Sequence, residues 1–174
     1  MRDLSSDGRR IRHRVALAPS KRGCDMAFYT AIDAQVIEPN ASAVFTATPI
    51  ADSTGNVKHA DGTSTFTLSG GPNKKKTCPC CNTQPCKQYP INFGANIAIN
   101  TGGTVGEISV AFAVNGSAIP VSTMAVTPAA VEEYFNVSRE IPVPIWCGCC
   151  QSVTITNTSN QAILMRNASI EIEG

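Results

Sequence analysis

The sequence predicts an all-β sandwich. Short stretches alternate apolar and polar residues with a period of two, which is typical of strands that bury one face. Glycine, proline and asparagine residues separate these stretches at regular intervals. Only Pro128–Glu133 has a helical character, enough for about one turn. The length of 174 residues suits one domain with a substantial core.

The clearest pattern lies in Tyr89–Gly116, which predicts two strands joined by a glycine turn at residues 101–103. Tyr89, Ile91 and Phe93 alternate with polar residues in the first strand. In the second strand the larger apolar side chains share one face, because they occupy every second position: Ile108, Val110, Phe112 and Val114. Asn115-Gly116 ends this strand, since both residues accept a positive φ at low cost.

The stretch before this pair contains two further predicted strands. Met26 is a natural start for the folded part, and a turn is expected at Pro39-Asn40. Ser42–Thr46 is predicted as a strand, followed by a polar connection over residues 50–62. Thr63–Leu68 alternates, with Phe66 and Leu68 on one face.

The stretch after the pair contains four more. Ser117–Thr127 is a short strand region broken by Pro120. Phe135–Ile145 keeps a period of two, and Pro142 and Pro144 place it at a sheet edge or bulge because proline cannot donate to a ladder. The last strands are Gln151–Asn157 and Gln161–Glu173. About eight short strands with almost no helix predict a jelly-roll sandwich.

The N-terminal residues 1–24 are predicted to form an extended, basic connecting arm on a domain of residues 25–174. The arm has seven basic and two acidic residues, a net charge of +5, whereas residues 25–174 have seven basic and eleven acidic residues, a net charge of −4. The arm has too few apolar side chains to order alone. We expect it to dock on an acidic surface, such as another copy, a coat or a capsid, with nucleic acid as the less favoured partner; the alternative is a solvated tail that docks on nothing. Its candidate contacts are Arg9, Arg10, Arg12 and Arg14.

Eight cysteines are the most unusual feature of the composition. One lies at the end of the arm and the others form two clusters in predicted loops: Cys24; Cys78, Cys80, Cys81 and Cys86; Cys147, Cys149 and Cys150. Structural disulfides are one interpretation. Close neighbours in sequence make strained partners, so pairs between loops or between subunits are favoured. The single cysteine of the arm is well placed to reach another subunit.

A zinc site is the second interpretation. The C-x₂-C spacing of Cys78 with Cys81 and of Cys147 with Cys150 matches the spacing of zinc knuckles. A free-thiol or redox role is the third, although such motifs normally open a helix in a βαβ unit, which this sequence lacks. No other cofactor is expected.

Catalytic patterns are missing from the sequence. The two histidines, His13 and His59, lie in the arm and in a polar loop, where solvated side chains are expected. Glu132-Glu133 is adjacent in sequence, so the two carboxylates point apart, and no phosphate-binding glycine motif occurs. We therefore expect a protein that is not an enzyme. The N-terminal stretch has no apolar signal core and no run suits a membrane helix, so export would depend on lysis or an unusual route.

The order of several short motifs resembles a known family. Val44-Phe45-Thr46 is followed by residues 62–68, GTSTFTL, then by Tyr89–Phe93, residues 108–112 with Asn115-Gly116, Val153–Asn157 and Ala168–Ile172. This order is similar to the C1q/TNF-like jelly roll of bacteria, as in the C-terminal domain of collagen-like spore-surface glycoproteins. The resemblance covers residues 33–174 but not the cysteine clusters, and the arm has no Gly-X-Y repeats.

The resemblance implies a homotrimer with aromatic residues packed about a three-fold axis. Candidates for that axis are Phe112, Tyr134 and Phe135, with ordinary monomer core as the alternative. Loops in the resembling fold can also bring both cysteine clusters to one end of the sandwich. A cysteine on an N-terminal connector is, in design only, similar to endospore appendage subunits.

These features predict a non-enzymatic structural subunit that assembles with itself into an extracellular fibre or surface layer. The arm would join one trimer to the next, and the cysteines would lock the contact. A spore product released by lysis of the mother cell needs no signal peptide. Two alternatives stay open: a phage virion protein, such as a head decoration or fibre, and a C1q-like head that binds a ligand.

Overall fold

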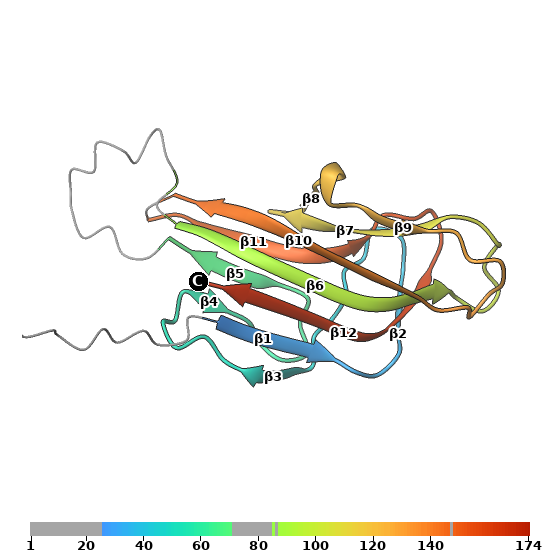
Figure 1. Ribbon diagram of the computed structural model, residues 1–174, viewed down its shortest axis with the longest axis horizontal. Coiled ribbons are helices and arrows are strands. Elements are labelled where there is room, and N and C mark those ends of the chain that lie inside the picture. The colour runs from blue at the N-terminus through green and yellow to red at the C-terminus, as the bar shows by residue number, and fades with distance from the viewer. Residues whose placement is uncertain (1–25, 71–84, 86, 147) are drawn as a thin grey trace, which may run out of the picture.

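Two antiparallel sheets face each other and enclose one apolar core (Figure 1). The computed structural model describes residues 26–70, 85, 87–146 and 148–174. In these ranges the strands are β1 (Met26–Ala31), β2 (Gln35–Ile37), β3 (Ala47–Ile50), β4 (Val57–Lys58), β5 (Phe66–Ser69), β6 (Lys87–Ile99), β7 (Ile108–Val114), β8 (Ser117–Ala118), β9 (Met124–Val126), β10 (Phe135–Ile145), β11 (Cys150–Asn157) and β12 (Ile163–Glu173). A 3₁₀ turn, η1 (Pro120–Ser122), lies between β8 and β9.

The strand order is that of a jelly roll. Sheet A has the order β10-β6-β12-β1-β3, and β2 also pairs with β12; sheet B has the order β4-β5-β11-β7-β8, and β9 also pairs with β7. From β5 to β7, and again from β10 to β12, each successive strand changes sheet, so neighbours in sequence face each other across the core. This confirms the predicted all-β jelly-roll sandwich.

The inward residues of both sheets fill the space between them. The largest fully buried side chains include Tyr89, Phe45, Phe66, Phe93 and Phe112. Burying one such side chain contributes roughly 1.5–3 kcal/mol. The period of two predicted in β5, β6, β10 and β11 is therefore the pattern that closes the sandwich.

The last strand contains a bulge that the sequence shows as a change of phase. Its buried residues are Ile163 and Met165, then Ala168, Ile170 and Ile172. The register on β6 shifts between Arg166 and Ser169, and Asn167 has a φ of 51°. The backbone N–H of Asn167 then donates to the carbonyl of Ile32 at 3.1 Å. The extra residue thus keeps both halves of β12 facing the core.

Four details differ from the expectations. The strands of Tyr89–Gly116 exist, but β6 and β7 lie in different sheets, because the turn at Gly102 (φ 86°) carries the chain across the core. Ser42–Thr46 makes only isolated bridges at Ser42 and Phe45. Pro128–Glu133 is a non-helical turn, and the helical turn lies at η1 instead. The described ranges hold twelve strands rather than eight, since several short edge strands have only two to four residues.

Candidate functional site

The two cysteine-bearing loops leave the sandwich at the same end, which we call the cysteine end (Figure 1). It is defined by the ends of β5 and β10 and the starts of β6 and β11. Ile145 of β10 lies opposite Lys87 of β6, and Cys150 of β11 lies opposite Ser69 of β5. The N–H of Gly70 donates to the carbonyl of Cys149 at 3.1 Å. The chain segments that flank the two clusters are therefore neighbours.

Two of the eight cysteines belong to the described residues. Cys149 and Cys150 are exposed, free thiols at the start of β11. A turn presents them, since the N–H of Cys149 donates to the carbonyl of Trp146 at 3.0 Å and Gly148 has a φ of 73°. The other six candidates lie outside the described residues: Cys24, Cys78, Cys80, Cys81, Cys86 and Cys147.

A buried tyrosine forms the floor of the cysteine end. The hydroxyl of Tyr89 donates to the carbonyl of Ser69 at 2.6 Å, and Lys87 Nζ lies 4.6 Å from the ring centroid. Burial raises the pKa of Tyr89 to about 12, with smaller contributions from the negative charges of Asp52 and Cys150. Tyr89 thus holds β6 against the end of β5, where the chain leaves the sheet toward the first cysteine cluster.

The cysteine end offers thiols but no complete metal site among the described residues. No group of three or more His, Cys, Asp or Glu side chains gathers in these ranges. Of the candidate zinc ligands, Cys150 is described, while Cys78, Cys81 and Cys147 lie outside. Thiols at such a position can pair with other thiols or bind a soft metal once further ligands join them.

The arm joins the folded part at the cysteine end, because β1 begins there at Met26 (Figure 1). Its predicted contacts, Arg9, Arg10, Arg12 and Arg14, lie outside the described residues. The described residues carry four basic and ten acidic side chains. Their charge is therefore opposite in sign to that of the arm.

The aromatic candidates for a three-fold axis separate into two groups. Phe112 is fully buried, and its ring centroid lies 6.2 Å from that of Phe93, so it packs between the sheets of one chain. This packing agrees with the alternative of ordinary monomer core that the sequence left open for Phe112. Tyr134 and Phe135 are half-buried at the start of β10, and Arg166 lies 3.7 Å from the centroid of the Tyr134 ring.

His59 is not the solvated loop residue that its polar neighbours suggest. Its ring stacks on Phe66, with centroids 4.3 Å apart, and contacts Tyr29 edge-on. Nδ1 lies 3.1 Å from the carbonyl of Thr65, and Nε2 lies 3.3 Å from that of Phe45. The imidazole therefore ties β5 to residue 45 and has a structural role. The aromatic residues that contact it are distant in the sequence, so the residues next to His59 could not predict this packing.

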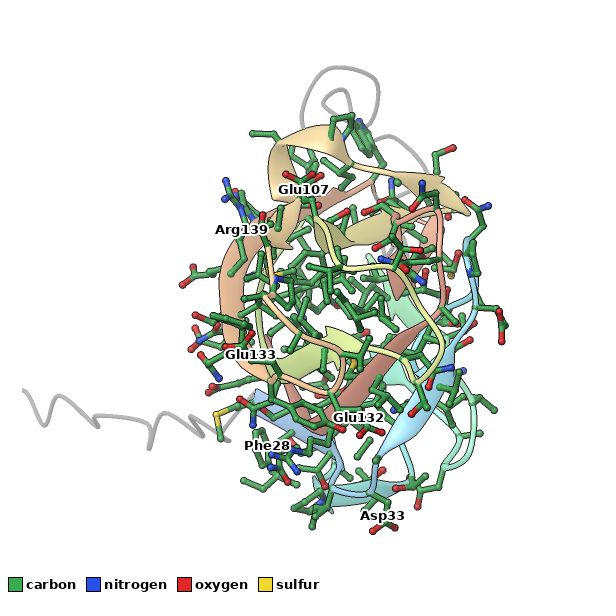
Figure 2. All side chains as sticks on the ribbon, turned by 90° about the vertical axis from the view of Figure 1, so that its right-hand side faces the viewer. Phe28, Asp33, Glu107, Glu132, Glu133 and Arg139 are labelled. Carbon is green, nitrogen blue, oxygen red and sulfur yellow. The ribbon has the colours of Figure 1, made fainter. Side chains whose placement is uncertain are left out.

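The opposite end of the sandwich, which we call the loop end, carries acidic side chains around shallow hollows. Figure 2 looks onto it and labels Glu107, Glu132 and Glu133. A hollow of about 530 Å³ is lined by Thr104, Val105, Gly106, Glu107, Asn160 and Gln161. Its lining includes neither a histidine nor a cysteine.

The fold places this chain in the class of jelly-roll domains. Its structure is similar to the globular domain of zebrafish complement 1qA protein, with 10% sequence identity, a TM-score of 0.51, and coverage of 85% of this chain and 94% of that chain. The PRD1 vertex protein P5 matches with 11% identity, a TM-score of 0.45, and coverage of 86% and 96%. The chain thus has a C1q/TNF-like jelly-roll fold, as its sequence motifs predicted.

The similarity extends to the fold and no further at this level of identity. No protein-family model matches the sequence, and no curated protein matches it. Within the part of the chain that the structure describes, no helix is long and apolar enough to cross a membrane.

Proposed function

We propose that this chain is a non-enzymatic structural subunit that assembles with itself into an extracellular fibre or surface layer, on a spore or a cell. The basic arm joins neighbouring copies, and cysteines cross-link the contact. One observation carries the proposal: the exposed thiols of Cys149 and Cys150 lie at the end of the sandwich where the arm joins the folded part. A cross-link formed there would tie the arm of one copy to the folded part of another.

Electrostatics supports the contact between the arm and another copy. The arm has a net charge of +5, and the described part of the domain has ten acidic against four basic residues. Opposite charges steer association and fix its orientation more than they add affinity. Disulfide formation then converts a reversible contact into a covalent one. It removes two electrons and two protons, which molecular oxygen accepts once the protein is outside a reducing compartment.

The outer face of sheet A supports packing between copies. A hollow of about 200 Å³ is lined by Phe28, Asn92, Phe93, Gly94, Ser138, Ser169 and Glu171. A Cβ added at Gly94 would have no neighbour closer than 3.8 Å, so packing inside the monomer does not require glycine at this position. Glycine in a strand often marks a bulge or a close approach by a ligand or another backbone, and Gly94 lies opposite Ser169, where the register of β12 shifts. We propose this face as the contact of a homotrimer, with Tyr134 and Phe135 at the start of β10 as further candidates that do not line the hollow.

The test compares non-reducing and reducing gels of the purified native protein, with a zinc assay on the same sample. We expect ladders of higher oligomers that collapse with reductant, and a weaker ladder in a Cys149→Ser/Cys150→Ser variant. Ser152→Ala on the same strand is the matched control and should leave the ladder unchanged. Single bands in both lanes with stoichiometric zinc would contradict covalent assembly, and would favour a metal-stapled trimer acting as a virion protein or a ligand-binding head.

A further inference from the structure

Between β9 and β10 the two sheets lie side by side without sharing a ladder. Among the described residues β9 pairs only with β7 of sheet B, and β10 pairs only with β6 of sheet A. Cα atoms of β9 and β10 nevertheless come within 8 Å of each other. A hollow of about 360 Å³, which we call the seam, is lined by residues 123–126 and 136–139 of this region.

The seam contains a positive charge that has no partner. Among the described residues of its lining, Arg139 is the only one that carries a charge. On β10 it shares a face with the buried residues Val137 and Ile141, because every second residue of a strand points the same way. Arg139 itself is exposed at the margin of the molecule (Figure 2). Its guanidinium makes no hydrogen bond, ion pair or ring contact with any other described residue.

The backbone of β10 directs a donor and an acceptor into the seam. Pro142 lies directly opposite Pro90 of β6, and the register along the pair is unbroken. Neither proline has an N–H, so the two cannot form a hydrogen-bonded pair of the antiparallel ladder. Pro142, and every second residue from it, therefore points its backbone groups away from β6. Ser138 is one of these residues, so its N–H and C=O face the seam.

The backbone of β9 contributes a second donor and acceptor from the other side. Ala125 lies opposite Ser109 of β7. The N–H of Ser109 donates to Ser159 Oγ at 2.7 Å, and its carbonyl accepts from the N–H of Thr158 at 3.0 Å. Both groups of Ser109 are thus engaged on the side away from β9, so Ser109 and Ala125 form a non-hydrogen-bonded pair. The N–H and C=O of Ala125 therefore also face the seam.

These groups define the kind of ligand that suits the seam. A guanidinium and two N–H donors suit the oxygens of an anion, and a guanidinium binds such oxygens in pairs. The carbonyls of Ala125 and Ser138 point the same way, however, and they repel an anion that can only accept hydrogen bonds. Hydrogen phosphate accepts through its charged oxygens and also donates through its P–O–H group.

We propose that the seam binds hydrogen phosphate, held by the side chain of Arg139 and by the backbone groups of Ala125 and Ser138. Because β9 and β10 belong to different sheets, the bound ion bridges sheet B and sheet A where no ladder does. This inference goes beyond the proposed function and does not depend on assembly through the arm or the cysteines.

The experiment titrates the reduced 174-residue chain with inorganic phosphate and follows the amide signals of Ala125 and Ser138 by NMR. Chloride keeps the ionic strength constant, and the pH is held at about 8, where hydrogen phosphate and sulfate carry the same charge. We expect saturable shifts with half-saturation at roughly 1 mM, as suits one exposed arginine. Sulfate has no O–H group and should bind about tenfold more weakly or less.

Arg139→Gln is the test variant, and it should weaken phosphate binding about tenfold or more. Arg139→Lys keeps the charge but not the planar fork, so its affinity should lie between those of wild type and Arg139→Gln. Lys58→Gln is the matched control, since it removes an equal charge at an exposed residue outside the seam and should bind as wild type does. Absence of saturable shifts in wild type, equal binding of phosphate and sulfate, or equal binding by wild type and Arg139→Gln would each overturn this inference and leave the proposed function untouched.

Discussion

The two ends of the sandwich differ in the chemistry that they expose. At the loop end, side chains bind neighbouring turns directly: Thr104 donates its N–H to Gln161 Oε1 at 2.8 Å, and Gln161 Nε2 donates to the Thr104 carbonyl at 2.9 Å. Thr101 Oγ1 donates to Glu132 at 2.6 Å, and Glu133 accepts from the N–H of Ala129 at 2.8 Å. These turns are fixed without any covalent link.

The cysteine end also has side-chain hydrogen bonds among its described residues: the Asp52 carboxylate accepts from the N–H groups of Asn56 and Val57, and Asn115 Oδ1 accepts from the N–H of Ser152. Tyr89 donates to Ser69, and two backbone bonds join Gly70 to Cys149 and Cys149 to Trp146. It differs from the loop end in its exposed thiols, Cys149 and Cys150. Noncovalent bonds therefore fix the turns at both ends of this jelly roll, and only the cysteine end adds thiols to them among the described residues.

The largest effect is expected from Asn157→Ala at the loop end. Asn157 is fully buried; its Nδ2 donates to the carbonyls of Ile37 and Gln161, both at 2.9 Å, and its Oδ1 accepts from Ser159 at 2.8 Å. Its loss leaves buried backbone groups without partners and should lower the free energy of unfolding by about 3–4 kcal/mol. Urea unfolding measures this. Asn160→Ala, at an exposed neighbour, should change stability little; equal losses would contradict the special role of Asn157.

A reductant should act on the cysteine end alone. Any disulfide that closes within one subunit, rather than between copies, should stabilise that subunit. Its reduction should then lower the free energy of unfolding by ~3 kcal/mol for each link. Amide exchange should then increase at residues 87–89 and 149–152, while the turns of the loop end stay protected. Superimposable unfolding curves with and without reductant would show that no such intrasubunit link exists.

Gly103→Ala tests how tightly the turns of the loop end are packed. A Cβ at this position would lie 2.6 Å from Ile99 Cγ2 and 2.9 Å from Gln161 Oε1, so it would displace the amide that holds Thr104. We expect a loss of about 2 kcal/mol from this overpacking. Gly106→Ala is the matched control, since a Cβ there meets nothing within 4 Å. Thermal unfolding of both variants tests the difference, and a neutral Gly103→Ala would refute the packing argument.

The smallest effect is expected from Tyr89→Phe at the cysteine end. Loss of one hydrogen bond to Ser69 should cost about 1 kcal/mol at neutral pH. The pH dependence carries more information. The pKa of Tyr89 is raised to about 12, above the value near 10 of an unfolded chain. Stability from this shift is complete below about pH 10 and is lost as the pH rises toward 12.

The Tyr89→Phe variant should therefore lose less stability than wild type between pH 10 and 12. Thermal midpoints across this range measure the difference. Tyr134→Phe is the control, because Tyr134 is half-buried under Arg166 at the start of β10, away from the cysteine end. An alkaline loss of stability that is the same in wild type and Tyr89→Phe would assign it to other groups.

The sequence predicted the strands whose side chains alternate between core and solvent. The predicted inward residues all lie in the core: Phe66 and Leu68 of β5, Tyr89, Ile91 and Phe93 of β6, and Val153 and Ile155 of β11. The edge position of β10 also followed from its two prolines, because a missing N–H is a local property. The local sequence was sufficient to predict a structural feature wherever a single residue type, such as proline, decides the backbone geometry.

The sequence could not show which strand pairs with which. β6 and β7 are adjacent in the chain, yet they do not pair with each other: β6 pairs with β10 and β12, and β7 pairs with β11, β8 and β9. Alternation fixes which side of a strand is buried but not the sheet to which the strand belongs. The same limit applied to Phe112, whose period matched a buried face without saying what covers it. For the cysteines, the sequence predicted two loop clusters, and the fold brings their flanking segments together.

The position of β12 has a consequence for the order of events during synthesis. β12 lies between β6 and β1 in sheet A, so the sheet lacks a central strand until the last part of the domain leaves the ribosome. Folding dominated by such distant pairings is slow. During that interval the end of the sandwich that carries Cys149 and Cys150 is not yet folded. Under the proposed function, oxidation before β12 has paired would join thiols that the fold has not yet positioned, so a reducing site of synthesis would protect assembly.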